Sequence, residues 1–139
     1  MGNRLHQRGS TLIDVCAACV MGSITMALAL PWYHDWKERD GRADAVVALQ
    51  RVQQAQAEFR AANGRYALRL DTLDAALTPY SDKGLYRLEM YSEAPDSFEV
   101  HATAVNDRAQ ARDPSCARVT LRVSGSVIAY EPSLRCWNP

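Results

Sequence analysis

A run of sixteen uncharged residues near the start of the chain, Val15 to Leu30, limits what this sequence can fold into. A short basic leader with Arg4 and Arg8 precedes the run, and a single acid, Asp14, stands at its beginning. The run is slightly shorter than the roughly 20 apolar residues that a helix needs to span a membrane. The sequence therefore predicts one hydrophobic helix, followed by a water-soluble part.

Three interpretations of this helix compete. A cleaved secretory signal would use Ala27-Leu28-Ala29 as its small-residue cleavage site. A plain signal anchor would keep Arg4 and Arg8 inside the cell and the water-soluble part in the periplasm. It leaves the acid unexplained, because an ionisable group in a membrane usually has a partner or a function. In the third interpretation the leader is cut after Gly9, so that the new amine of Ser10 lies near Asp14 and the two charges neutralise each other.

The residues around the acid resemble the type IV pilins and the related type II secretion pseudopilins. Gly9, the segment Thr11-Leu12-Ile13 and Pro31 match the family signature as they stand, and Asp14 occupies the place of the family's glutamate. Ser10 replaces the usual Phe or Met. The resemblance implies cleavage by prepilin peptidase between Gly9 and Ser10, N-methylation of Ser10, an assembly charge pair made by Asp14, and a helix kink at Pro31.

A second helical pattern begins after a charged segment. Apolar residues recur there at three- and four-residue spacing, and Asn63-Gly64 is a good C-terminal stop. This predicts one helix from Ser10 to Asn63, with an amphipathic half whose apolar stripe needs a partner. We expect Gly41 to loosen the helix and Gln56 to lie at the edge of the stripe. The stripe consists of Ala45, Leu49, Val52, Ala55, Phe59 and Ala62.

The remainder of the chain predicts an antiparallel sheet that covers the stripe. A short helix is expected over residues 70–77, and alternating apolar residues then indicate four strands in a meander. The fold class is therefore α+β, a long N-terminal helix packed on a four-stranded antiparallel sheet. The four strands are expected at residues 85–92, 97–105, 117–123 and 126–130.

The four cysteines form two pairs in the sequence. We interpret Cys16 and Cys19, inside the apolar run, as packing residues. Cys116 and Cys136 enclose a loop that a disulfide can close, and the bond is expected if this part lies outside the cytoplasm. A helix, a four-stranded sheet and a disulfide-bounded end again resemble the pilins, most closely type IVa minor pilins of the PilE type.

The sequence holds no constellation typical of an enzyme or a metal site, and we expect no cofactor. The net charge is formally zero, which excludes a bulk electrostatic footprint for nucleic acid. Basic residues outnumber acids between Arg108 and Arg122: the stretch contains one acid, Asp113, and four arginines, Arg108, Arg112, Arg118 and Arg122. We favour a solvated surface there, and DNA is a partner without support from the sequence. Tyr80, Tyr86 and Tyr91 are candidates for exposed aromatics.

The resemblance implies a non-enzymatic minor pilin that primes or caps a type IV pilus used in twitching, adhesion or DNA uptake. Its parts would be a leader (1–9), a transmembrane and assembly helix (10–33), the amphipathic half of the same helix (34–63) and a β-sheet head (64–139). The implied partners are other pilin subunits, both major and minor, prepilin peptidase, the inner-membrane assembly platform and, before assembly, the membrane itself.

The implied location is the bacterial inner membrane with the head in the periplasm, and then the pilus surface. Three alternatives stay open: a type II secretion pseudopilin, a major pilin, and a periplasmic or DNA-binding module on a signal anchor that uses Arg108 to Arg122.

Overall fold

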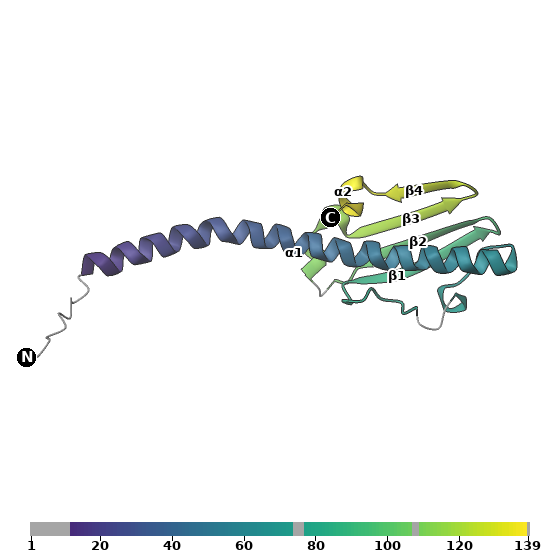
Figure 1. Cartoon of the computed structure of the whole chain (residues 1–139), viewed down its shortest axis with the longest axis horizontal. Coiled ribbons are helices and arrows are strands. Elements are labelled where there is room, and N and C mark those ends of the chain that lie inside the picture. Colours follow the sequence, from purple (N-terminus) through teal and green to yellow (C-terminus); the bar gives the residue numbers. More distant parts are fainter. Residues whose placement is uncertain (1–11, 74–76, 107–108, 139) are drawn as a thin grey trace, which may run out of the picture. The chain divides into compact units, whose positions relative to one another are not determined.

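The computed structural model describes residues 12–73, 77–106 and 109–138, except for the side chains of Pro31, Ala109 and Arg112. The chain divides into an N-terminal unit that ends at Trp36 and a C-terminal unit that begins at Lys37. One helix, α1 (Leu12–Asn63), contributes to both units (Figure 1). The expected long helix is thus confirmed from Leu12 onward, and its first two residues lie outside the described range.

In the N-terminal unit the described side chains of α1 are exposed, and Leu12 at its start is 83% exposed. Two hydroxyl groups in this apolar stretch are satisfied by the helix itself. Ser23 Oγ donates to the Cys19 carbonyl at 2.7 Å, and Thr25 Oγ1 donates to the Met21 carbonyl at 3.1 Å. Among the described residues, α1 is the one helix long and apolar enough to cross a membrane, with a mean hydropathy of 2.0 over its most apolar window.

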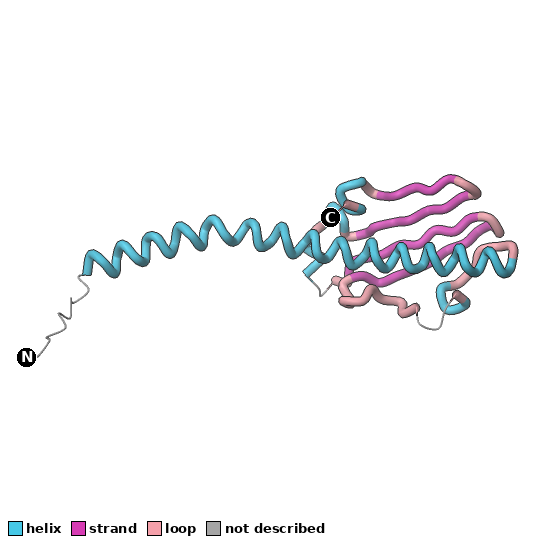
Figure 2. The backbone as a smooth tube through the Cα atoms, in the orientation of Figure 1, coloured by secondary structure: helices cyan, strands magenta, loops and turns pink. Residues whose placement is uncertain are grey.

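In the C-terminal unit α1 packs on one face of a four-stranded sheet (Figures 1 and 2). Ala45, Leu49 and Val52 are fully buried there, as the helical spacing predicts. Further along the stripe, Ala55 and Phe59 are only partly buried, and Ala62 is exposed. The helix residues share one core with inward-facing strand residues, among them Leu88, Val100, Val119 and Leu121.

The sheet has the order β1-β2-β3-β4 with every neighbouring pair antiparallel, which confirms the predicted meander. Apolar and polar residues alternate along the strands, so one set of side chains faces α1 and the other set faces away. The face away from α1 is called the outer face below. The strands are β1 (Tyr86–Ala94), β2 (Ser97–Ala104), β3 (Arg118–Ser124) and β4 (Val127–Glu131).

Gln56 is the buried polar residue of the helix stripe. It is fully buried rather than at the stripe's edge. Its side chain forms the hydrogen bonds that the backbone of Ala67, in the segment after α1, would otherwise lack. Its amide nitrogen donates to the Ala67 carbonyl at 3.0 Å, and its amide oxygen accepts from the Ala67 N–H at 2.9 Å. Because both backbone groups of Ala67 are satisfied in this way, a glutamine can occupy a core position at little cost.

Gly41 does not loosen α1, which runs through it as a continuous helix. Its role is close approach, because a Cβ at this position would lie 1.8 Å from the side-chain oxygen of the buried Gln110. A larger residue here would therefore force Gln110 out of place. Tyr86 also differs from expectation, since it is fully buried in the core, whereas Tyr80 and Tyr91 are exposed.

The prediction of a helix over residues 70–77 is wrong for the residues of this range that the structure describes. A single 3-10 turn, Leu70–Thr72, takes its place, and residues 74–76 lie outside the described part. Arg69 is the residue before this turn and supplies no side-chain cap. It pairs instead with Asp71, at 3.1 and 2.5 Å, so the aspartate is not free to cap a longer helix.

Three short segments complete the C-terminal unit. They are two 3-10 turns between β2 and β3, Ala109–Arg112 and Pro114–Cys116, and one short helix after β4, α2 (Leu134–Trp137).

Candidate nucleic-acid interface

The loop before β3 and the helix α2 are joined by the disulfide Cys116–Cys136, which confirms the predicted bond. Both cysteines are fully buried. Tyr86 of β1 donates its phenol hydrogen to the Cys116 carbonyl at 3.0 Å, so the bond is tied to the sheet as well. This part of the unit, residues 109–118 and 131–138, is called the disulfide end below.

A buried ion pair fixes α1 to the disulfide end. Arg42 Nε donates to Asp113 Oδ2 at 2.7 Å, and both side chains are only 4% exposed. Asp113 lies between two 3-10 turns, where Ser115 Oγ donates to it at 2.6 Å and Gln110 Nε2 at 3.2 Å. Arg42 Nη2 donates to Glu38 Oε2 at 3.2 Å. The sequence showed Asp113 only as the one acid among residues 108–122 and did not predict this pair.

The pKa of Asp113 is lower than that of an ordinary aspartate. Burial alone would raise the pKa, but the hydrogen bonds from Arg42 and Ser115 and the positive charge of Arg42 outweigh it. Asp113 is therefore a carboxylate at neutral pH, turned inward toward Arg42. Its charge acts mainly on Arg42 and in smaller part on Arg135, which changes the charge balance that the sequence alone gives for residues 108–122.

The four arginines of that stretch have different surroundings. Arg108 lies outside the described residues, and the side chain of Arg112 is likewise not described. Arg122 is held by Glu99, with Nε at 2.9 Å and Nη2 at 3.1 Å from the carboxylate oxygens. Arg118 is exposed and has no carboxylate partner in the part of the chain that the structure describes. Of the two arginines in this stretch whose side chains are described, Arg118 is thus the one whose charge is still available.

The outer face around Arg122 is internally neutralised. Glu99 lies between Arg122 and His101, whose Nε2 is 3.3 Å from the Glu99 carboxylate. The hydrogen bond from Arg122 holds the pKa of Glu99 below its usual range, although partial burial opposes this. His101 Nδ1 lies 2.9 Å from the hydroxyl of Thr120. These groups satisfy one another and leave little charge for an external anion.

A different row of the outer face carries positive charge that the described carboxylates compensate only in part. The strand register places Thr103 of β2 directly between Arg87 of β1 and Arg118 of β3. Tyr80 extends the row, because it forms an isolated antiparallel bridge with Arg87. Arg87 was missed in the sequence because it lies far from residues 108–122, although the alternation in β1 marks it as outward-facing.

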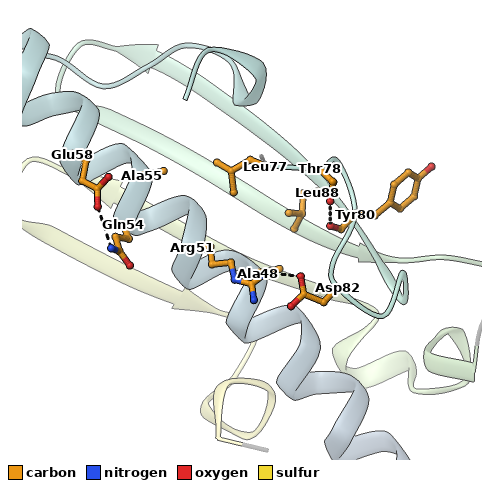
Figure 3. A pocket seen from close by; sticks show the side chains of 10 residues that line it. All are labelled: Ala48, Arg51, Gln54, Ala55, Glu58, Leu77, Thr78, Tyr80, Asp82 and Leu88. Carbon is orange, nitrogen blue, oxygen red and sulfur yellow. Dashed lines mark hydrogen bonds and ion pairs between the residues drawn. The ribbon is translucent and has the colours of Figure 1, made fainter. Parts of the chain in front are cut away.

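A groove of about 360 Å³ lies between α1 and residues 77–82, and its charged groups are already paired (Figure 3). Arg51 of α1 forms an ion pair with Asp82 across it, and Gln54 donates to Glu58 at 3.0 Å. The hydrogen bond from Arg51 and its charge lower the pKa of Asp82 despite some desolvation. The groove therefore offers no unpaired cation to a phosphate.

The assembly residues predicted from the sequence belong to the N-terminal unit. Gly9 and Ser10 lie outside the described residues, so cleavage and methylation stay predictions. Asp14 lies in the first turn of α1, where a negative charge suits the helix dipole. Pro31 lies within α1, and its kink also stays a prediction.

The free cysteines of this unit, Cys16 and Cys19, are exposed. Their interpretation as packing residues therefore stays a prediction, which would require a neighbouring helix or lipid to cover them. Among the described residues, no group of three or more His, Cys, Asp or Glu side chains is arranged to hold a metal ion.

A long N-terminal helix on a four-stranded antiparallel meander, with a disulfide at the C-terminal end, is the fold of a pilin. Residues 31–120 match a protein family described as "Type IV minor pilin ComP, DNA uptake sequence receptor". The chain belongs to this family of minor pilins. No curated protein matches the chain.

Family membership confirms the minor-pilin prediction and its structural, non-enzymatic character over the pseudopilin alternative. The match begins at Pro31, so the pilin signature from Gly9 to Asp14 is a separate and independent observation. Arg87, Thr103 and Arg118 all fall inside the matched range.

Proposed function

We propose that this chain is a low-copy subunit of a type IV pilus whose C-terminal unit binds DNA during uptake. The observation that carries the proposal is the family match, which covers most of the C-terminal unit and names a DNA uptake sequence receptor. The pilin signature and the apolar part of α1, both largely outside the match, support incorporation into a filament separately.

Assembly would begin with the chain in the bacterial inner membrane and its C-terminal unit in the periplasm. Prepilin peptidase would cut between Gly9 and Ser10, and the assembly platform would then move the apolar helix from lipid into the filament. Asp14 would pair there with the N-terminal amine of a neighbouring subunit. The exposed apolar side chains of the N-terminal unit support this proposal, because only lipid or other helices can cover them.

DNA binding would rest on a few local arginines rather than on overall charge, because the net charge is zero. Phosphate contacts supply most of the non-specific affinity of proteins for DNA, and arginine is well suited to them. Arg118 and Arg135 are exposed near the disulfide. The buried Asp113 acts electrostatically on Arg135 but is hydrogen-bonded to Arg42 instead. Arg118 and Arg135 are the first choice for phosphate contacts.

Asp14→Ala is expected to abolish or strongly reduce the amount of this chain in sheared pili, because the acid would no longer pair with a neighbour's amine. Membrane insertion should stay normal, since removing a charge makes insertion easier. The measurement is immunoblotting of sheared pili and of membranes. Normal levels of the variant in pili would refute the charge pair.

Intact mass of the mature protein tests the processing step. A start at Ser10, methylated or not, supports assembly, whereas a start at Leu30 indicates a cleaved secretory signal. A retained Met1 indicates a plain anchor.

Arg118→Gln combined with Arg135→Gln should weaken binding of the full-length chain to duplex DNA at least tenfold in non-ionic detergent. Loss of two phosphate contacts should also make the slope of log affinity against log salt less steep by about 1.8. The matched control is Arg51→Gln combined with Arg69→Gln, which removes two exposed arginines that already have carboxylate partners. Equal weakening by both double variants would show that only total charge matters.

A further inference from the structure

A hollow of about 340 Å³ lies on the outer face where β1, β2 and β3 meet the loop after β2. Its walls include Arg87, Thr103 and Arg118, and Glu89 also lines it, with Tyr80 and Asn106 beside them. It is separate from the groove of Figure 3, although Tyr80 borders both. Figure 3 shows the Tyr80 ring directed away from Arg51 and Ala48 of that groove.

The strand register sets the spacing of the two arginines. Arg87 pairs with Thr103, and Thr103 pairs with Arg118, so the three residues form one row across the sheet. Neighbouring strands lie about 4.8 Å apart, which puts the two arginine Cα atoms roughly 10 Å from each other. Two long guanidinium side chains at this spacing can approach one tetrahedral anion from opposite sides.

The charges of this row are largely uncompensated. Arg118 has no carboxylate partner in the described residues, and Arg87, with a side chain that is 62% exposed, has only Glu89 at 3.6 Å. That contact is too long for a good hydrogen bond, so Arg87 is free to turn toward an anion. Glu89 lines the same hollow, and the two arginines together outweigh its single negative charge. The hollow therefore differs from the Glu99–Arg122 part of the same face, where the arginine is held by two short hydrogen bonds.

The hydroxyl between the two arginines adds an independent observation. Thr103 Oγ1 is buried and has no hydrogen-bond partner within the described residues. A buried hydroxyl without a partner destabilises a fold, and its presence needs an explanation. A neutral donor between two guanidinium groups is a combination that suits a phosphate group, because phosphate oxygens accept hydrogen bonds from several sides.

We propose that the hollow formed by Arg87, Thr103 and Arg118 binds one backbone phosphate of a DNA strand. The two guanidinium groups flank the phosphate, and the Thr103 hydroxyl donates to one of its oxygens. The inference rests on the proposed function, which supplies the DNA, and it names residues of two strands that the stretch Arg108–Arg122 does not include. An extended backbone fits this site better than a small free anion, because both arginines and Tyr80 are exposed and enclose little.

Thr103→Val separates binding from folding and from charge. The substitution removes only the hydroxyl, so we expect duplex DNA to bind roughly fivefold more weakly, the loss of about one hydrogen bond. Thermal unfolding should occur at the same or a higher temperature, because no internal hydrogen bond is lost. The measurements are fluorescence anisotropy with a labelled duplex and thermal unfolding of the full-length chain, both in non-ionic detergent.

Arg87→Gln and Arg118→Gln test the flanking charges. Each should reduce the salt slope by less than 0.9 and the two together by about 0.9, because both arginines contact one phosphate. Adding Thr103→Val to either variant should cost less than it does alone, for the same reason. Arg69→Gln is the matched control, an exposed arginine paired with Asp71 that should leave the slope unchanged.

The outcomes separate the two proposals. If the wild-type chain does not retain DNA, both fail. In a second outcome, the wild type binds DNA and the double variant Arg118→Gln with Arg135→Gln binds it less tightly, but Arg87→Gln and Thr103→Val bind it like the wild type. The hollow is then not a phosphate site, and the proposed function stands. Inorganic phosphate is the second probe, and the chemical shift of the Thr103 backbone amide is the measurement. A shift change that saturates with millimolar phosphate but is absent with duplex DNA would assign the hollow to a free anion and overturn the proposal.

Discussion

Asp113→Ala should lower the free energy of unfolding of the C-terminal unit by about 3 kcal/mol. Removing one partner of a buried ion pair typically costs about 3–5 kcal/mol, because the other charge is left without compensation. The lower end applies here because Arg42 keeps its contact with Glu38 at 3.2 Å. Chemical denaturation of the full-length chain in non-ionic detergent, followed by near-ultraviolet circular dichroism, measures the difference.

The effect of Asp113→Ala should depend on pH in a defined direction. The pKa of Asp113 is lower in the folded chain than in the unfolded chain. Its stabilising contribution is therefore complete above the unfolded pKa of about 3.9 and is lost as the pH falls through the folded pKa. The wild type and the variant should converge in stability in strong acid. A difference that stays constant down to that range would contradict the ion pair.

Asp82→Ala is the matched control for this experiment. It also removes an aspartate that pairs with an arginine of α1, but both Asp82 and Arg51 are exposed. Exposed ion pairs contribute little to stability, so the control should unfold almost like the wild type at every pH. A loss as large as that of Asp113→Ala would mean that burial is not what makes the Arg42 pair important.

Replacing Cys116 and Cys136 together by alanine should cost about 3 kcal/mol of unfolding free energy. The bond closes a loop with a sequence separation of 20 residues, and opening such a loop increases the entropy of the unfolded chain. Alanine is preferable to serine here because both positions are fully buried and a hydroxyl would lack partners. Denaturation under non-reducing conditions measures the loss, which reduction of the wild type should reproduce.

The second cysteine pair provides the control. Cys16 and Cys19 are exposed free thiols in the N-terminal unit. Replacing both by alanine should leave unfolding of the C-terminal unit unchanged under oxidising and reducing conditions alike. If reduction destabilised neither the wild type nor this control variant, the disulfide would contribute nothing to the stability of the unit.

The sheet was predictable because its strands are half-buried, and half-buried strands reveal themselves by alternation. Val100 and Leu121, for example, are apolar residues between polar neighbours, and they pair with each other on the face toward α1. The helix stripe was predictable because only one face of the helix is buried, so its apolar residues recur at three- and four-residue spacing. Gln56 was the exception, because its burial depends on the backbone of Ala67 rather than on its own polarity.

Contacts between distant residues were not predictable from local patterns. Arg42 and Asp113 are 71 positions apart, and neither residue type signals a buried position. Gly41 suggested a weak point in the helix, whereas its small size serves the approach of Gln110. For the candidate interface, the basic stretch 108–122 already contained Arg118. That Arg87 lies in the same row of the sheet can be inferred only when the register of three strands is known.

The contacts between residues 38 and 44 of α1 also decide how this chain responds to pulling. A pilus subunit experiences tension along its helix, and such tension reaches the C-terminal unit first at these residues. Arg42 leads to the loop that carries Asp113, while Asp40 and Asp44 lead to Lys83, at 2.6 Å through its ammonium group and 3.1 Å through its N–H. Pulling the helix out of the C-terminal unit therefore requires breaking its links to two separate loops, one of which the disulfide joins to the end of the chain.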